Sequence, residues 1–224
     1  MNNETTVYRG FERFWHWTQA ALILLLAMTG FEIHGSLEFL GYSQAVMLHN
    51  TAAIGLLILI AFAVFWHFTT GEWRQYLPTR RMVRAQVDYY ITGIFHDAPH
   101  PTRKTSTNKL NPLQKLVYLG IKILVIPVMV ISGLLYMFYR YPQSHGAALL
   151  GSAQLRTVAL LHTAGAFFLI AFVVGHIYLT TTGTTPLSNI RAMLTGRESL
   201  HQNFEEQKSN IGAEPVAEAF RGQA

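Results

Sequence analysis

The stretch TVALLHTAGAFFLIAFVVGHIY, residues 157–178, decides the fold class of this chain. It carries no Asp, Glu, Lys or Arg, and it is long enough to cross a bilayer as a helix, which needs about 20 apolar residues. His162 and His176 lie fourteen residues apart within it. In a helix this spacing is about 40° short of four turns and rises about 21 Å, so both imidazoles leave one face, one near each membrane surface. Two ionisable rings in a spanning helix indicate buried ligands or a proton path.

We interpret these histidines as axial ligands of two b-type haems, one above the other. Cysteine is absent from the 224 residues, which excludes iron–sulfur clusters, covalent c-type haem and thiolate metal sites, and leaves histidine as the main metal ligand. Half of the residues are apolar, as in a small membrane protein. The net charge of +5 comes mainly from residues that flank apolar segments, so we expect no nucleic-acid binding.

Four apolar segments are long enough to span a membrane, and we expect them to form an all-α bundle. They cover about residues 12–33, 47–69, 113–138 and 157–179. The segments and their loops are expected to form one transmembrane domain, residues 1–190, followed by a cytoplasmic tail, residues 191–224.

The distribution of basic residues predicts the orientation. The loop 70–112 carries seven Lys and Arg residues, whereas the loop 34–46 carries none and the loop 139–156 carries two. The positive-inside rule therefore places the long loop and both termini in the cytoplasm, and the short loops in the periplasm. Within the long loop, the apolar residues of 82–94 form one helical stripe, which predicts an amphipathic helix on the membrane surface. We expect a multi-pass protein of the bacterial inner membrane.

The other apolar segments supply the remaining ligands. His16 lies in the first turns of the first segment, and His49 begins the second. With the predicted orientation, His16 and His176 lie near the cytoplasmic surface, and His49 and His162 near the periplasmic surface. Each level then holds two histidines, as a haem iron with two axial imidazoles requires.

Two other residues are weaker candidates. His67 lies eighteen residues from His49, which is five turns and about 27 Å along the same face, so it is a reserve ligand in place of His16. The shorter rise between His162 and His176 matches His16 better. Lys122 lies about 13 Å inside the third segment, where it either extends toward the surface or pairs with a haem propionate.

The chain resembles the bacterial diheme cytochrome b family, which includes membrane subunits of nickel–iron hydrogenases, respiratory formate dehydrogenases and thiosulfate-type reductases. Five stretches carry the resemblance: ERFWHW (12–17), TGFEIHG (29–35), HNTAAIG (49–55), KLNPLQK (109–115) and HTAGAFFLIAFVVGHIY (162–178). The resemblance implies a four-helix bundle in which His16 and His176 bind the cytoplasmic haem and His49 and His162 the periplasmic haem.

The resemblance also implies a quinone pocket beside the cytoplasmic haem, formed partly by an Asn in a K-x-N-x-x-Q-K stretch. Lys109, Asn111, Gln114 and Lys115 match that pattern, and Pro112 departs from the small residue expected after the Asn. Alternatively, Asn111 is simply the N-cap of a helix that has Pro at its first position.

We therefore expect an electron-transfer subunit of a quinone-linked respiratory oxidoreductase complex. It would connect the membrane quinone, either menaquinone or ubiquinone, to a periplasmic partner of the iron–sulfur, molybdenum, hydrogenase or multihaem c type. Two alternatives stay open: a quinone-reducing diheme cytochrome without a partner, and a haem-free proton channel or transporter that uses histidine as a relay. The sequence leaves open whether the protein is an oligomer.

Overall fold

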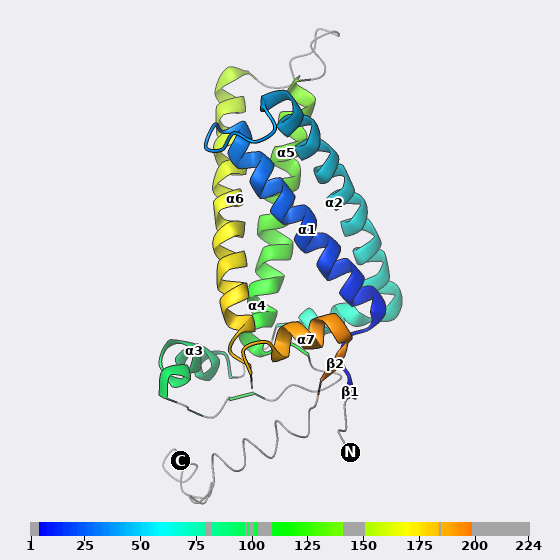
Figure 1. Cartoon of the computed structure of the whole chain (residues 1–224), viewed down its shortest axis with the longest axis vertical. Helices are drawn as coiled ribbons and strands as arrows, with labels where there is room; N and C mark the ends of the chain where they lie inside the picture. The colour runs from blue at the N-terminus through cyan, green and yellow to red at the C-terminus, as the bar shows by residue number, and fades with distance from the viewer. Residues whose placement is uncertain are drawn as a thin grey trace, which may run out of the picture.

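The structure, a computed structural model, contains the four expected long apolar helices (Figure 1). It describes residues 5–78, 82–96, 98, 101–102, 109–140, 151–183 and 185–198. The spans are α1 (Gly10–Ile33), α2 (Tyr42–Thr70), a third span made of three consecutive segments, and α6 (Ser152–Thr180). The third span consists of α4 (Pro112–Gly120), η3 (Ile121–Val125) and α5 (Ile126–Arg140).

Two helices begin earlier than the apolar pattern predicts. α2 starts at Tyr42 and α6 at Ser152, whereas their apolar segments start near residues 47 and 157. Each begins directly after a glycine, and Gly41 has φ = 84°, a left-handed conformation that favours glycine. Hydropathy marks the part of a helix that suits lipid, whereas its first residue is set by such local backbone geometry.

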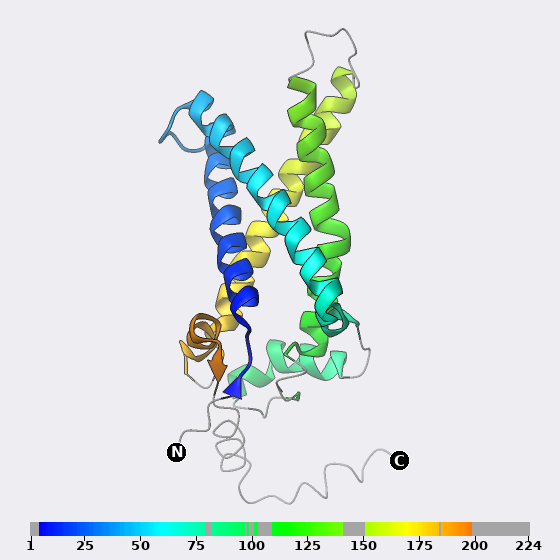
Figure 2. The same ribbon diagram turned by 90° about the vertical axis from the view of Figure 1, so that its right-hand side faces the viewer.

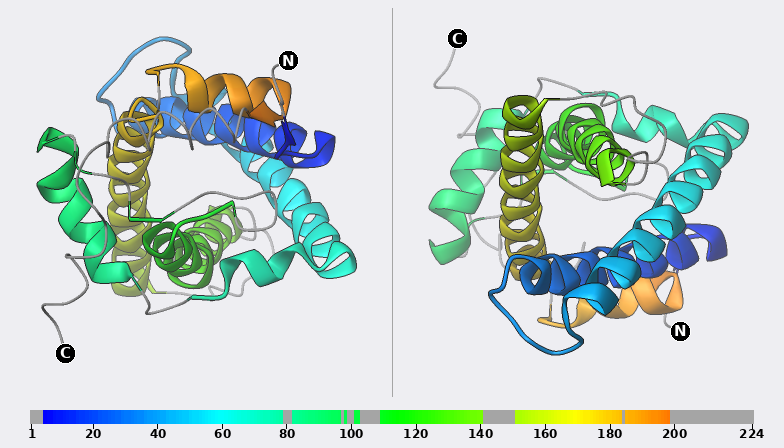
Figure 3. Two further views of the ribbon diagram at one scale, coloured as in Figure 1. Left: turned by 90° about the horizontal axis from the view of Figure 1, so that it is seen from below. Right: turned by 90° about the horizontal axis from the view of Figure 1, so that it is seen from above.

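The spans pack as two antiparallel pairs, α1 against α2 and α5 against α6. Seen along the long axis, the four helices surround a common centre (Figure 3). We use "terminal end" for the end of the bundle that holds residues 5–9 and 185–198, and "far end" for the end that holds the loop 34–41 (Figures 1 and 2).

The third span changes helix type near its middle. η3 is a π-helical turn, and it ends at Val125, two residues before Pro127. Proline has no backbone N–H to donate to the carbonyl four residues earlier, so an ordinary α-helix is interrupted there. Next to Pro127 the third span therefore contains a widened turn, which also includes Lys122.

Short elements cover the terminal end. β1 (Thr5–Thr6) pairs antiparallel with β2 (Arg197–Glu198), and α7 (Ser188–Thr195) lies beside α1 (Figures 1 and 2). Arg13 donates a hydrogen bond to the Leu194 carbonyl at 2.6 Å, and Trp17 donates one to the Met193 carbonyl at 3.3 Å. These bonds fasten α7 to the first turns of α1.

The long loop contains η1 (Glu72–Tyr76), α3 (Val83–Ile91) and η2 (Gly93–His96). The buried residue of α3 is Gln86, while Met82 precedes the helix and is exposed, as is Ile91. Val83, Val87 and Tyr90 of the predicted apolar stripe are half-buried, and Arg84 and Asp88 are exposed. Gln86 is the most buried residue of the helix, and it accepts a hydrogen bond from Thr102 at 2.8 Å. Arg80, Arg81, Arg103 and Lys104, the loop 141–150 and the tail 199–224 lie outside the described residues.

Candidate functional site

The four predicted histidines meet in two pairs at two levels of α6. At the terminal end, the ring centroids of His16 and His176 lie 6.1 Å apart. At the far end, those of His49 and His162 lie 6.4 Å apart. Each pair joins α6 to one helix of the other hairpin, α1 at the first level and α2 at the second. All four rings are half-buried.

Both separations fit two imidazoles on one iron. An imidazole nitrogen lies about 2.0 Å from a metal that it binds, so rings on opposite sides of one ion have centroids roughly 6 Å apart. Within the described part of the chain, no group of three or more His, Cys, Asp or Glu side chains could hold a bare metal ion. A pair of histidines suits a haem, because the porphyrin occupies the other four positions of the iron.

At the far end, each ring has a hydroxyl partner on the neighbouring helix of its own hairpin. Thr29 Oγ1 lies 2.9 Å from His49 Nδ1, and Ser132 Oγ lies 3.0 Å from His162 Nδ1. Both bonds engage Nδ1 and leave Nε2 available to a metal. Metal-binding histidines usually have such a partner on the other ring nitrogen.

The terminal-end pair is held differently. Tyr118 Oη lies 3.5 Å from His176 Nδ1, at the limit of a hydrogen bond, and Phe172 stacks on the His176 ring with the centroids 5.9 Å apart. His16 Nδ1 is buried and has no hydrogen-bond partner among the described residues. The ring centroids of His16 and Trp17 lie 5.1 Å apart. Ring contacts of this kind therefore orient the terminal-end pair more than hydrogen bonds do.

Glycines lie against both far-end rings. A Cβ atom on Gly30 would be 3.7 Å from His49 Cε1, and one on Gly133 would be 3.1 Å from His162 Cε1. Gly133, Thr29, Ser132 and Tyr118 were not predicted from the sequence. At both far-end rings a hydroxyl residue is followed by glycine in the sequence. The role of this pattern can be recognised only once it is known which helices pack together.

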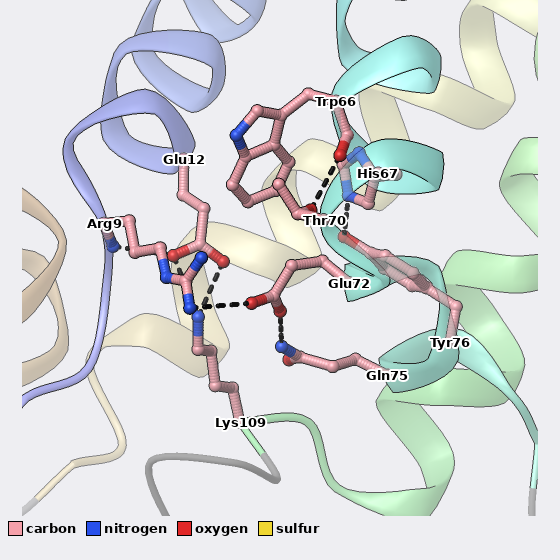
Figure 4. A network of polar contacts seen from close by, with 9 residues as sticks. All are labelled: Arg9, Glu12, Trp66, His67, Thr70, Glu72, Gln75, Tyr76 and Lys109. Carbon is pink, nitrogen blue, oxygen red and sulfur yellow. Dashed lines mark hydrogen bonds and ion pairs between the residues drawn. The ribbon is translucent and has the colours of Figure 1, made fainter.

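His67, the reserve ligand, has protein partners on both ring nitrogens. Its Nδ1 lies 2.6 Å from the Ala63 carbonyl, to which it donates, and its Nε2 lies 3.3 Å from the Tyr76 hydroxyl. The rings of Trp15, Trp66 and Tyr76 contact the His67 ring. Figure 4 shows Trp66 and Tyr76 beside it. This geometry favours His16 over His67 as the partner of His176.

Lys122 contacts aromatic rings. Its Nζ lies 3.1 Å from the Tyr76 ring centroid and 5.6 Å from that of Trp15. No described carboxylate forms a salt bridge with it. The ammonium group is thus held by cation–π contacts on the α1 side of the third span, next to the helix turn that contains His16.

Asn111 is the N-cap of α4, as its alternative interpretation predicted. Its Oδ1 accepts from the Gln114 backbone N–H at 2.8 Å, and the Gln114 side chain accepts from the Asn111 N–H at 3.0 Å. Pro112 occupies the first helical position. Asn111 Nδ2 donates to the Tyr90 hydroxyl at 3.0 Å. The cap uses the carbonyl oxygen of the side chain and leaves one amide hydrogen available.

The sequence of this chain matches a recognised family of membrane proteins. The family described as prokaryotic cytochrome b561 matches residues 7–196, which include all four spans and both histidine pairs. A protein of Escherichia coli (strain K12) named "Putative cytochrome YdhU" is 32% identical over 191 residues, which cover 82% of this chain and 70% of that protein.

Proposed function

We propose, because this chain belongs to the prokaryotic cytochrome b561 family, that it is the diheme membrane subunit of a quinone-linked oxidoreductase. The protein is a multi-pass membrane cytochrome of the bacterial inner membrane. The proposal adds three points to that statement: two haems, an exchange of electrons with membrane quinone, and a periplasmic redox partner.

The observation that carries the proposal is the spacing of the two histidine pairs along α6. His162 and His176 face two different helices, and each meets its partner ring at a centroid distance of about 6 Å, as one iron between two imidazoles requires. When bound, haem supplies one-electron redox chemistry at each level. His16, His176, His49 and His162 would hold the haem iron at the two levels, and the apolar helices would surround the haems.

The charges of the described residues support the proposed orientation. The elements at the terminal end (Figure 1) contain most of the described basic residues, namely Arg9, Arg13, Arg74, Arg84, Lys109, Lys115, Arg191 and Arg197. At the far end, the described part of the chain contains Arg140, the last residue of α5, and Arg156. By the positive-inside rule the terminal end is cytoplasmic, so that His16 and His176 lie on that side and His49 and His162 on the periplasmic side.

The proposed partner follows from the size of the far-end loops. The loops 34–41 and 141–151 are too short to contain a cofactor domain, so a separate periplasmic protein with iron–sulfur, molybdenum, hydrogenase or multihaem c centres would exchange electrons there. Quinone would then react at the terminal end, where Asn111 and the loop 70–112 connect the bundle to water.

The test is haem stoichiometry in the purified protein and in four single variants. We expect two low-spin b haems per chain, extracted by acidified organic solvent because they are not covalently bound. His49→Ala and His162→Ala should lose one and the same haem, and His16→Ala and His176→Ala the other. One haem in the unaltered protein, or a covalent haem, contradicts the proposal. A protein that co-purifies in mild detergent would identify the partner.

A further inference from the structure

We propose that two hydroxyl–glycine pairs, Thr29–Gly30 and Ser132–Gly133, are positioning elements that fix the tautomer and the orientation of His49 and His162. The proposal rests on the proposed function, because it concerns the far-end histidines as ligands. Each pair lies on one helix of a hairpin and serves the ring on the antiparallel neighbour: α1 serves α2, and α5 serves α6.

The first step of the argument concerns the hydroxyl protons. Thr29 Oγ1 donates to the Leu25 carbonyl at 2.8 Å, one turn back in its own helix. Ser132 Oγ donates to the Val128 carbonyl at 2.5 Å in the same way. A hydroxyl has a single proton, so an oxygen that donates it to a carbonyl of its own helix accepts a hydrogen bond from the histidine that it faces.

The tautomer of both rings follows from these bonds. Because the hydroxyl oxygens accept, His49 and His162 carry their protons on Nδ1. The lone pair of each ring is then on Nε2, the nitrogen that the hydrogen bond leaves available to iron. Thr29 is fully buried and Ser132 is 4% exposed, so water does not compete for either bond.

The glycines set the position of the rings. Cε1 is the ring atom between the two nitrogens, and it faces the glycine that follows each hydroxyl residue. At Gly133 a Cβ atom would be 3.1 Å from His162 Cε1, closer than ordinary van der Waals contact. At Gly30 the corresponding distance to His49 is 3.7 Å, which is ordinary contact. Alanine should therefore displace His162 more than His49.

The terminal-end pair lacks this arrangement among the described residues. His176 faces the Tyr118 hydroxyl at 3.5 Å, and His16 Nδ1 has no described hydrogen-bond partner. The chain thus contains its own reference: a change in Thr29 or Ser132 should affect one haem, and the other haem in the same molecule should stay unchanged.

A hydrogen-bond acceptor on Nδ1–H makes the imidazole a more basic ligand. A more basic ligand stabilises ferric over ferrous iron and lowers the reduction potential of the haem. Removing the acceptor should therefore raise the potential of the far-end haem and weaken haem binding there by roughly 10- to 100-fold, as for other partners of metal-bound histidine.

The experiment compares Thr29→Val, which keeps the shape of the side chain and removes the acceptor, with Thr29→Ser, which restores it. Ser132→Ala and Ser132→Thr form a second, independent set. Redox titration of the visible spectrum gives the potential of each haem, and His162→Ala identifies the band of the far-end haem. Transfer of haem to excess apomyoglobin measures retention.

We expect Thr29→Val and Ser132→Ala to raise the potential of the far-end haem alone and to release it faster, and we expect Thr29→Ser and Ser132→Thr to restore both values. Unchanged potentials in both acceptor-free variants overturn the proposal, as do equal shifts of both haems or shifts that the hydroxyl variants fail to reverse. If one variant does not fold, the other set decides. Fewer than two haems in the unaltered protein would instead contradict the proposed function.

Discussion

Lys109 Nζ lies 2.6 Å from Oε1 and 2.8 Å from Oε2 of Glu12, and both side chains are largely buried (Figure 4). The ion pair connects the first turn of α1 to the residues that precede α4. Glu12 Oε2 also accepts from the Arg9 backbone N–H at 2.7 Å. Arg9 in turn forms a salt bridge with Glu72, which accepts from the Gln75 side chain. The pair therefore belongs to a polar network that connects α1, η1 and the residues before α4 at the terminal end.

The first prediction concerns this ion pair. Lys109→Met should lower the free energy of unfolding by about 3–5 kcal/mol, because it leaves the Glu12 carboxylate buried without a counter-charge. Denaturation in detergent, followed by circular dichroism, measures the loss. Arg84→Met is the matched control: Arg84 is almost fully exposed and, within the described part of the chain, forms an ion pair with the exposed Asp88, so we expect little change. Equal stability of the two variants would contradict the prediction.

The second prediction separates His67 from His16. His67→Ala should keep both haems, because both ring nitrogens already bond to the protein, at the Ala63 carbonyl and the Tyr76 hydroxyl. His16→Ala should lose one haem. Pigment extraction and the visible spectrum measure both variants. A haem lost from His67→Ala and retained in His16→Ala would show that His67, and not His16, binds the haem.

The third prediction concerns Lys122. If its ammonium group lies close enough to a haem propionate to pair with it, Lys122→Met should lower the potential of the terminal-end haem, because a lost positive charge stabilises the oxidised state. Lys122→Arg keeps the charge and should restore the potential. The far-end haem should be unaffected in both. Identical potentials in the methionine and arginine variants would leave Lys122 with only its cation–π contacts to Tyr76 and Trp15.

Much of the architecture was predictable because it depends on helix geometry alone. A spanning helix must be long and apolar, so the four spans are visible in the sequence. The register of a helix fixes which side chains share a face, so the spacing of His162 and His176 already required partners at two levels. His16 and His49 meet them in the structure.

The supporting residues could not be predicted in this way. Thr29 and Ser132 bond back to their own helix, as hydroxyl residues in helices often do, so nothing in their sequence context indicates a second partner. Their bonds to His49 and His162 depend on how two helices pack. The pairing of Thr5–Thr6 with Arg197–Glu198 could not be predicted either. It joins two segments nearly 200 positions apart, and each segment is too short to show a strand pattern in the sequence.

The fourth prediction concerns alkaline pH. Burial, with a smaller contribution from the Glu12 carboxylate, raises the pKa of Tyr76 above its ordinary value of 10.0. The folded protein therefore keeps the phenol proton when the unfolded chain has lost it, so stability should decrease as pH rises past about 10. Tyr76→Phe has no phenol proton and should show a smaller decrease. Melting temperatures between about pH 9 and pH 11 measure the difference. Parallel curves for the two proteins would contradict the prediction.

The last prediction tests Asn111 as part of a quinone site. Quinone approaches from the bilayer and exchanges protons with water, so its site should lie at a haem edge near a surface. We expect Asn111→Leu to leave both haem spectra near normal and to slow haem oxidation or reduction by quinone analogues sharply. Electron exchange with the periplasmic partner should continue, so activity with an artificial dye should survive. Stopped-flow absorbance with a soluble quinone measures the rates.

Because Asn111 also caps α4, the leucine variant must be compared with one that keeps the cap. Loss of the cap alone should cost about 1 kcal/mol of stability. Asn111→Asp retains the oxygen that accepts from the Gln114 N–H and removes the amide that donates to Tyr90. If quinone needs that amide, both variants should react slowly, and only the leucine variant should be less stable. Normal quinone kinetics in both, together with an inhibitor-induced shift confined to the far-end haem, would place the quinone site at the opposite end of the bundle.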